Sequence, residues 1–174
     1  MKLRSQRRRG NSVLEFTLVG IPLILMLISI FEVARGMWIY NTLAHAVREG
    51  TRFAIVHGQN CAAPPNACQR TVADVAAVIR DQGVGLAQTE TTVTLKNTAG
   101  ATVFSSVGPA LLSTLLANTT VWPSGPGSAP GNEVAVTATY KFRSAILMFW
   151  PGAGGGMNFP AFDLPAVSRD RIQF

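Results

Sequence analysis

The chain has little charge and few of the residues on which catalytic and metal sites depend. Only 14% of its 174 residues are charged, whereas about a quarter are charged in a typical soluble domain. The two histidines, His45 and His57, both lie on the predicted long helix, without a nearby cysteine or aspartate arranged for metal or nucleophile chemistry. Neither a G-x-S-x-G nor an H-E-x-x-H pattern is present. The sequence therefore predicts no enzyme, no metal site and no cofactor.

Most of the net positive charge lies in the N-terminal tail. Of the formal net charge of +6, Lys2, Arg4 and residues 7–9 contribute five charges, and no acidic residue accompanies them. The other 164 residues hold ten basic and nine acidic side chains. A nucleic-acid-binding protein needs a basic stripe on its folded part, so nucleic acid is not expected as a partner.

A long apolar run follows the basic tail. Residues 16–31, FTLVGIPLILMLISIF, contain no charge. As a helix they would cover about 24 Å, and extending the run to about residues 13–34 matches the roughly 30 Å of a hydrocarbon core. The positive-inside rule places the tail in the cytoplasm. We therefore predict a basic cytoplasmic leader (1–10), a transmembrane segment (about 13–34) and an extracytoplasmic remainder.

A cleaved secretory signal is the first alternative, because it would also combine a basic tail with an apolar run. The only tidy A-x-A cleavage pattern is Ala44-His45-Ala46, a dozen residues beyond the apolar run and after the charges of Glu32 and Arg35. This position disfavours cleavage by signal peptidase.

The helical pattern continues past the apolar run. No strong break occurs between Asn11 and His57, and Gly58 is suited to a C-cap. Glu32 with Arg35, and Glu49 with Arg52, have the spacing of intrahelical ion pairs. We predict one helix over residues 11–57, whose apolar stripe comprises Val33, Met37, Tyr40, Ala44, Val47, Thr51 and Ile55. This stripe is expected to pack against partner helices or against the head of the same chain.

A kink is predicted within the apolar run. Pro22 removes a backbone N–H and crowds the carbonyl of Leu18. Gly20 lies close by and weakens the helix further.

Residues 58–174 are predicted to form a small α+β head carried on the long helix. Thr71 and Asp74 have the spacing of a capping box at the start of a short amphipathic helix. A turn-rich connector is expected at residues 122–132. Alternating, β-branched segments predict an antiparallel sheet of three or four strands, at residues 91–96, 101–104, 134–142 and 166–172.

Cys61 and Cys68 flank a proline-containing loop, CAAPPNAC. In an oxidising compartment a disulfide is the expected state, and closing so short a loop is worth about 2 kcal/mol by loop-entropy arguments. Two free thiols are the alternative, since the spacing suits neither a metal site nor a C-x-x-C motif.

Glu15 is the unusual residue of the apolar segment. One interpretation places its carboxylate at the headgroup level of the membrane, where the cost of a charge is small. The other uses its spacing from Gly10. If the chain is cut after Gly10, Asn11 becomes a new N-terminus, and Glu15 is the fifth residue from it. In a bundle of parallel helices, the carboxylate of one subunit would then neutralise the ammonium group of a neighbour.

This layout resembles that of the type IV pilin superfamily: a basic leader, a glycine, four residues, a glutamate and an apolar helix. More specifically, GNSVLEFTLVGIPLILMLI followed by AHAVREGTRFA resembles TadE-like proteins, the minor pseudopilins of tight-adherence (Flp-type) pilus systems. Phe16 also fits, since pilins of that system often have tyrosine or phenylalanine after the glutamate.

The resemblance implies cleavage between Gly10 and Asn11 by a prepilin peptidase of the bacterial inner membrane. It implies that the major pilin and sibling pseudopilins are partners, and that the assembly ATPase and platform proteins act indirectly. The head would be periplasmic, or extracellular if the chain joins the pilus.

Two alternatives stay open. One is an uncleaved, signal-anchored envelope protein with a periplasmic binding head, which makes no use of Gly10 or Glu15. The other is a membrane-anchored periplasmic enzyme, which the lack of catalytic motifs disfavours.

Overall fold

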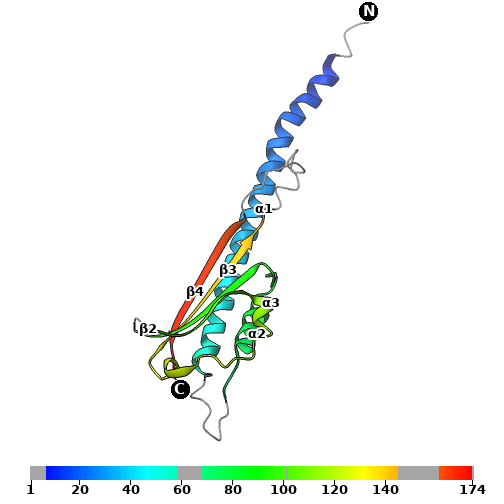
Figure 1. Ribbon diagram of the computed structural model, residues 1–174. Coiled ribbons are helices and arrows are strands. Elements are labelled where there is room, and N and C mark those ends of the chain that lie inside the picture. The colour runs from blue at the N-terminus through cyan, green and yellow to red at the C-terminus, as the bar shows by residue number, and fades with distance from the viewer. Residues whose placement is uncertain (1–6, 59–67, 101, 145–160, 174) are drawn as a thin grey trace, which may run out of the picture. The chain divides into compact units, whose positions relative to one another are not determined.

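The computed structural model describes residues 7–58, 68–100, 102–144 and 161–173 (Figure 1). The chain divides into two compact units, of which the first comprises residues 1–36 and 144–159 and the second residues 37–143 and 160–174. The elements are α1 (Arg7–Ile55), α2 (Val72–Gln82), β1 (Thr91–Ala99), β2 (Thr102–Leu111), α3 (Leu112–Leu115), a 3₁₀ turn η2 (Gly125–Ser128), β3 (Glu133–Phe142) and β4 (Phe162–Arg171). A long apolar helix, short helices and a four-stranded antiparallel sheet confirm the predicted α+β fold.

Helix α1 begins four residues before the predicted start and ends two residues before the predicted end. At its C-terminus the His57 N–H donates to the Ala54 carbonyl at 3.3 Å, three residues back, so that the final turn is tightened. The His57 ring stacks on Phe53 with centroids 4.3 Å apart, and its Nδ1 lies 2.8 Å from the Phe53 carbonyl oxygen. His45 is exposed on the helix, whereas His57 lies beyond the end of α1 and is half-buried, although the predicted helix included it.

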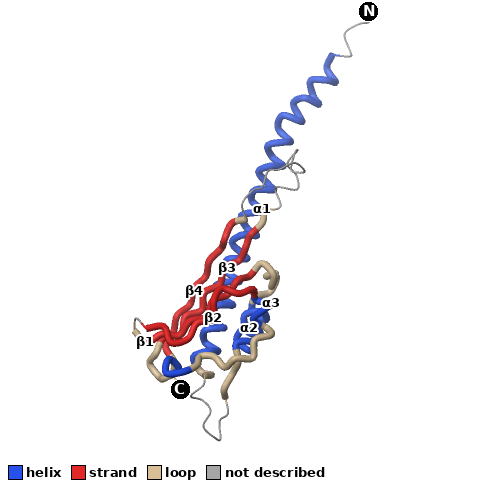
Figure 2. Tube along the Cα trace, in the orientation of Figure 1, coloured by secondary structure: helices blue, strands red, loops and turns tan. Residues whose placement is uncertain are grey.

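The sheet of the second unit has the strand order β2-β1-β3-β4 (Figure 2). Strands β1 and β3 are central and alternate in burial, as expected for a sheet with one face on the core. Strand β4 is one edge, where Pro165 is tolerated opposite Thr139. Strand β2 is the other edge, and its ladder with β1 contains two register shifts.

The core of the second unit lies between one sheet face and the helices, and includes residues from α1, α2, α3, β1 and β3. From α1 the core residues are Ile39, Leu43, Ala46, Val47, Ala54 and Ile55. The predicted stripe is thus correct at Val47, Thr51 and Ile55, which are buried. Met37 and Tyr40 are 62% and 48% exposed and so do not pack in the core of the head, and for them packing against partner helices stays a prediction.

Helices α1 and α2 approach closely at Gly50. A Cβ atom at this position would lie 2.6 Å from Cγ1 and 3.0 Å from Cδ1 of Ile79. Glycine within a helix costs about 1 kcal/mol relative to alanine, and here its lack of a side chain gives Ile79 the space to enter the core.

The connector at residues 122–132 contains the largest fully buried side chain of the described residues, that of Trp122. Its backbone N–H donates to the Arg70 carbonyl at 3.1 Å. Farther along, a Cβ at Gly127 would lie 2.6 Å from the Cβ of Phe104, and the Ser124 carbonyl accepts a bond from Asn97 Nδ2 at 3.1 Å. The predicted connector is therefore part of the core, and it covers one end of the sheet.

Helix α2 has the predicted capping box. The Thr71 hydroxyl accepts a bond from the Asp74 N–H at 3.3 Å, and the Asp74 carboxylate accepts one from the Thr71 N–H at 2.8 Å. The Thr71 N–H is the largest cause that lowers the pKa of Asp74, and the Thr71 hydroxyl lowers it further. Both halves of the box satisfy N–H groups that the helix would otherwise leave unpaired.

The capping box predicts a pH-dependent stability. Because the folded pKa of Asp74 is depressed, its contribution is complete above the ordinary aspartate range and is lost as the pH falls through the folded pKa. Asp74→Asn should therefore lower the free energy of unfolding at pH 7, and the difference from the native chain should shrink at acidic pH. Thr71→Ala should cost about 1 kcal/mol. Urea denaturation at pH 7 and at acidic pH measures both variants.

Asp81→Asn is the matched control, because Asp81 lies in the same helix in an exposed ion pair with Arg80. Such pairs contribute little, so this variant should resemble the native chain. An Asp74→Asn effect equal at both pH values would contradict the assigned role of the carboxylate.

Candidate assembly site on the N-terminal helix

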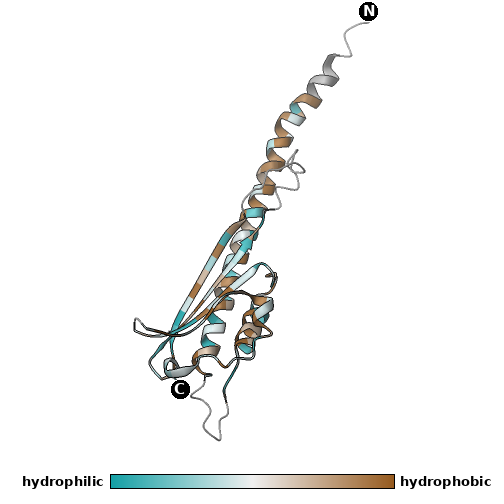
Figure 3. Ribbon diagram, in the orientation of Figure 1, coloured by the Kyte–Doolittle hydropathy of each residue, from teal (hydrophilic) through white to brown (hydrophobic). Residues whose placement is uncertain are grey.

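The part of α1 within the first unit presents apolar side chains on all sides. Figure 3 shows this hydrophobic stretch along the helix. Phe16 and Phe31 are 77% and 74% exposed, and nearly all residues from Val13 to Phe31 are exposed. Among the described residues, α1 is the one helix whose length and composition would allow it to cross a membrane. An apolar surface of this extent needs lipid or neighbouring helices around it.

The hydroxyl groups in this stretch bond to the helix itself. Thr17 Oγ1 donates to the Leu14 carbonyl at 3.0 Å, and Ser29 Oγ donates to the Leu25 carbonyl at 2.8 Å. In hydrocarbon an unsatisfied hydroxyl would cost free energy. These two residues are therefore compatible with a helix surrounded by lipid.

Glu15 is the one charged residue between Val13 and Phe31, and its side chain is exposed. Its neighbours Leu14 and Phe16 are exposed as well. An ionised carboxylate on an apolar helix surface is costly in lipid unless an opposite charge meets it. A charge pair between the Glu15 carboxylate and a group of another molecule would remove this cost.

The predicted kink residues lie on the helix just after this carboxylate. A Cβ at Gly20 would lie 3.8 Å from Phe16 Cε1, an ordinary contact, so the Phe16 ring lies over Gly20. Pro22 lies inside α1, which is assigned as helix on both sides of it. The kink itself stays a prediction.

The predicted site residues differ in how far the structure describes them. The backbone of Gly10 and Asn11 lies within α1, but the first six residues of the predicted leader lie outside the described residues. Cys61 also lies outside them, so its disulfide with Cys68 stays a prediction. In the part of the chain that the structure describes, no three histidine, cysteine or acidic residues gather into a metal-binding group.

Both predicted intrahelical ion pairs are present. Glu32 Oε1 lies 3.5 Å from Arg35 Nη1, and Glu49 Oε1 lies 3.0 Å from Arg52 Nη1. The first pair lies at the end of the apolar run, where it separates the membrane-compatible part of α1 from the part that packs in the head.

Sequence reasoning missed the exposed residues Trp38 and Tyr40 as a candidate site, and assigned Tyr40 to the packed stripe. They are 51% and 48% exposed. Their position in the sequence could have indicated such a site, because tryptophan and tyrosine directly after an apolar segment are typical of a membrane interface.

Comparison with known proteins is consistent with this description of α1. The search of curated proteins and the search of solved structures found no match for the chain. The family model described as TadE-like protein matches residues 10–52. The match begins at the predicted processing residue Gly10, contains Glu15 and ends three residues before α1 ends. Helix α1 therefore carries a TadE-like segment from Gly10 to Arg52.

Proposed function

We propose that the protein is a minor pseudopilin that takes part in assembly or priming of a tight-adherence pilus. In this proposal it is a single-pass protein of the bacterial inner membrane, with its N-terminus in the cytoplasm and its head in the periplasm. A prepilin peptidase cuts it after Gly10. The mature helix then packs beside the major pilin and sibling pseudopilins, while the assembly ATPase and platform proteins act indirectly.

One observation carries the proposal: a TadE-like segment that begins at Gly10 and has Glu15 as the one charged residue of its exposed apolar stretch from Val13 to Phe31. The spacing gives both residues a role. Cleavage after Gly10 creates an ammonium group at Asn11, and the carboxylate of a neighbouring subunit can neutralise it. A plain membrane anchor has no need of either residue.

The intact mass of the protein from its native membrane tests the processing step. The expected chain begins at Asn11, and its mass also shows whether Cys61 and Cys68 have lost two hydrogens to a disulfide. A chain that still begins at Met1, in cells with an active prepilin peptidase, would favour the uncleaved anchor and overturn the proposal.

A substitution at the cleavage site gives the matching prediction. Gly10→Val should reduce processing about tenfold or more, equivalent to roughly 1.4 kcal/mol in the cleavage barrier, because the branched side chain crowds the peptide bond that the peptidase must reach. Gly10→Ala is the control and should be cut far better. Intact mass gives the cleaved fraction, and equal cleavage of both variants would contradict processing at this bond.

A further inference from the structure

Exposed apolar side chains gather at one end of the second unit, the end at which the chain enters it. The four residues that we call the Met37-end patch are Trp38, Tyr40, Val84 and Phe162, which are 51%, 48%, 67% and 61% exposed. They come from α1, from the turn after α2 and from the first residue of β4.

A close contact fixes the turn after α2 against α1. A Cβ at Gly85 would lie 2.5 Å from Cη2 of Trp38, so the indole ring lies on the glycine backbone. Gly85 also has φ +84°, a conformation that favours glycine. The Leu86 N–H closes the turn with a bond to the Gly83 carbonyl at 3.0 Å. Val84 is thereby held beside Trp38 with its side chain pointing outward.

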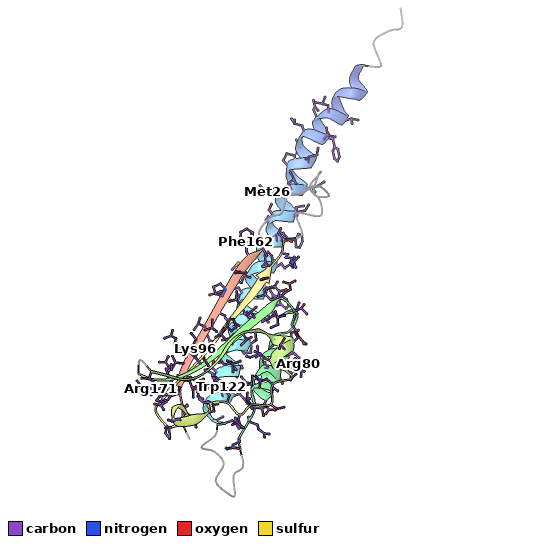
Figure 4. The ribbon with its side chains drawn as sticks, viewed as in Figure 1. Met26, Arg80, Lys96, Trp122, Phe162 and Arg171 are labelled. Carbon is purple, nitrogen blue, oxygen red and sulfur yellow. The ribbon has the colours of Figure 1, made fainter. Side chains whose placement is uncertain are left out.

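Strand β4 brings Phe162 to the same end. Just past the other end of this strand, the Gln173 N–H donates to the Ile55 carbonyl at 3.2 Å. From there the strand extends back over about 30 Å, and α1 extends back from Ile55 to Met37 over about 27 Å. Figure 4 shows Phe162 and Arg171 at opposite ends of β4. The first residue of β4, Phe162, is therefore about as far from the Gln173–Ile55 contact as Met37, the residue at which α1 enters the unit.

The charges at this end are balanced. Lys141 is paired in register with Asp163, and Arg143 Nη2 lies 3.2 Å from Glu90 Oε1. The patch therefore offers apolar and aromatic surface rather than a basic field, which suits the interface of a bilayer more than a highly charged partner.

The position of the patch in the chain identifies what it contacts. Trp38 follows Ala34, the last residue of the predicted membrane span, by four residues, which is about 6 Å along a helix. The polar layer of a bilayer is of similar depth, roughly 5 to 7 Å on each side. We propose that the Met37-end patch seats the head on the membrane–water interface, with Trp38, Tyr40, Val84 and Phe162 in contact with lipid.

A depth measurement on the full chain tests this. The Val84→Cys variant is labelled with an environment-sensitive fluorophore and reconstituted in phosphatidylcholine vesicles that contain lipids with a nitroxide near the headgroup. The probe at position 84 should lose most of its fluorescence. The matched control, Arg171→Cys, carries the same probe on an exposed residue at the far end of β4 and should keep its fluorescence. The chain without an added cysteine controls for labelling of Cys61 and Cys68.

Two further results show whether the patch itself holds the probe against lipid. Trp38→Ala removes the side chain that holds the turn, so quenching at position 84 should fall while the Arg171→Cys signal stays unchanged. Quenching should also be the same with or without anionic lipid, because the charges at this end are balanced.

An unquenched probe at position 84 would overturn the proposal, and so would equal quenching at both positions. Protection of the probe at position 84 from water that appears only when a second pseudopilin is present in the vesicle would also overturn the proposal. The patch would then be a protein interface. The measurement does not depend on cleavage after Gly10, since the processed and unprocessed chains both contain the patch.

Discussion

Glu15→Ala should leave the protein in the membrane but abolish its productive assembly into a pilus. Retention is expected because alanine makes the apolar run of α1 more hydrophobic. Loss of assembly is expected because the amine at Asn11 of a neighbouring subunit would lose its counter-charge. Removing one member of a buried pair costs about 3 to 5 kcal/mol, and each 1.4 kcal/mol is about a tenfold change in association. The measurement is the amount of membrane-bound chain, compared with pili counted by electron microscopy.

Two variants separate charge from shape in this experiment. Glu15→Gln keeps the length of the side chain and should fail as alanine does. Glu49→Gln alters another carboxylate of α1, one in a surface ion pair with Arg52, and should assemble normally because such pairs contribute little. Normal piliation by Glu15→Ala would show that the carboxylate is an interfacial residue without a role in assembly.

Gly50→Val should destabilise the head by about 3 kcal/mol, the upper part of the range for overpacked cores. The reason is the position of Ile79, whose Cγ1 would lie 2.6 Å from the new Cβ. Ile79 is 1% exposed and is surrounded by the core, so it has no free space into which to move. For a domain of this size the melting temperature should fall by roughly 10 °C, as measured by near-UV circular dichroism of the full chain in detergent micelles.

A double variant identifies the clash as the cause. Ile79→Ala alone should cost about 2 to 5 kcal/mol, but it also removes the atoms that the valine would meet. Gly50→Val combined with Ile79→Ala should therefore be less destabilised than the sum of the two single variants. Gly20→Ala is the control, because a Cβ there makes only an ordinary contact with Phe16. Additive losses would contradict a clash between the valine and Ile79.

The elements that local chemistry determines could be predicted closely from the sequence. The capping box placed the start of α2 at the correct residue, since Thr71 and Asp74 interact within one turn. Strand β3 was predicted at residues 134–142 and begins one residue earlier. Apolar and polar residues alternate along this strand because one of its faces is on the core and the other is not, so the sequence pattern could be recognised.

Elements shaped by tertiary context were predicted less well. Strand β2 extends to Leu111, well beyond the predicted residues 101–104, and it contains Gly108 and Pro109, which are uncommon inside strands. Strand β4 begins at Phe162, four residues before the predicted start at Ala166, and it includes Pro165. Edge strands tolerate such residues, but edge position depends on the order of strands, which no local pattern contains.

The candidate sites show the same division. The spacing of Gly10 and Glu15 could be read directly, because it is a local pattern. The apolar stripe on α1 only partly matches the residues that pack in the head, because Ile39 and Leu43 are buried there while Met37 and Tyr40 are exposed. Over so short a stretch, helical periodicity is compatible with burial of either of two faces of α1. The position of the sheet and of α2 decides which face is buried. The contact between Trp38 and Gly85 joins residues 47 positions apart, so the sequence could not indicate it.

The two edges of the sheet have a consequence for a protein confined to a membrane. Confinement of many copies to a thin layer raises the rate at which heads collide, and an open strand edge is a template for unwanted pairing. Strand β4 has Asp163, Pro165, Arg169 and Arg171 along its length, and β2 is distorted by its register shifts against β1. Charge, proline and irregular pairing each discourage edge-to-edge aggregation. In the proposed pseudopilin, these features would let the heads accumulate at high surface density without pairing at their sheet edges.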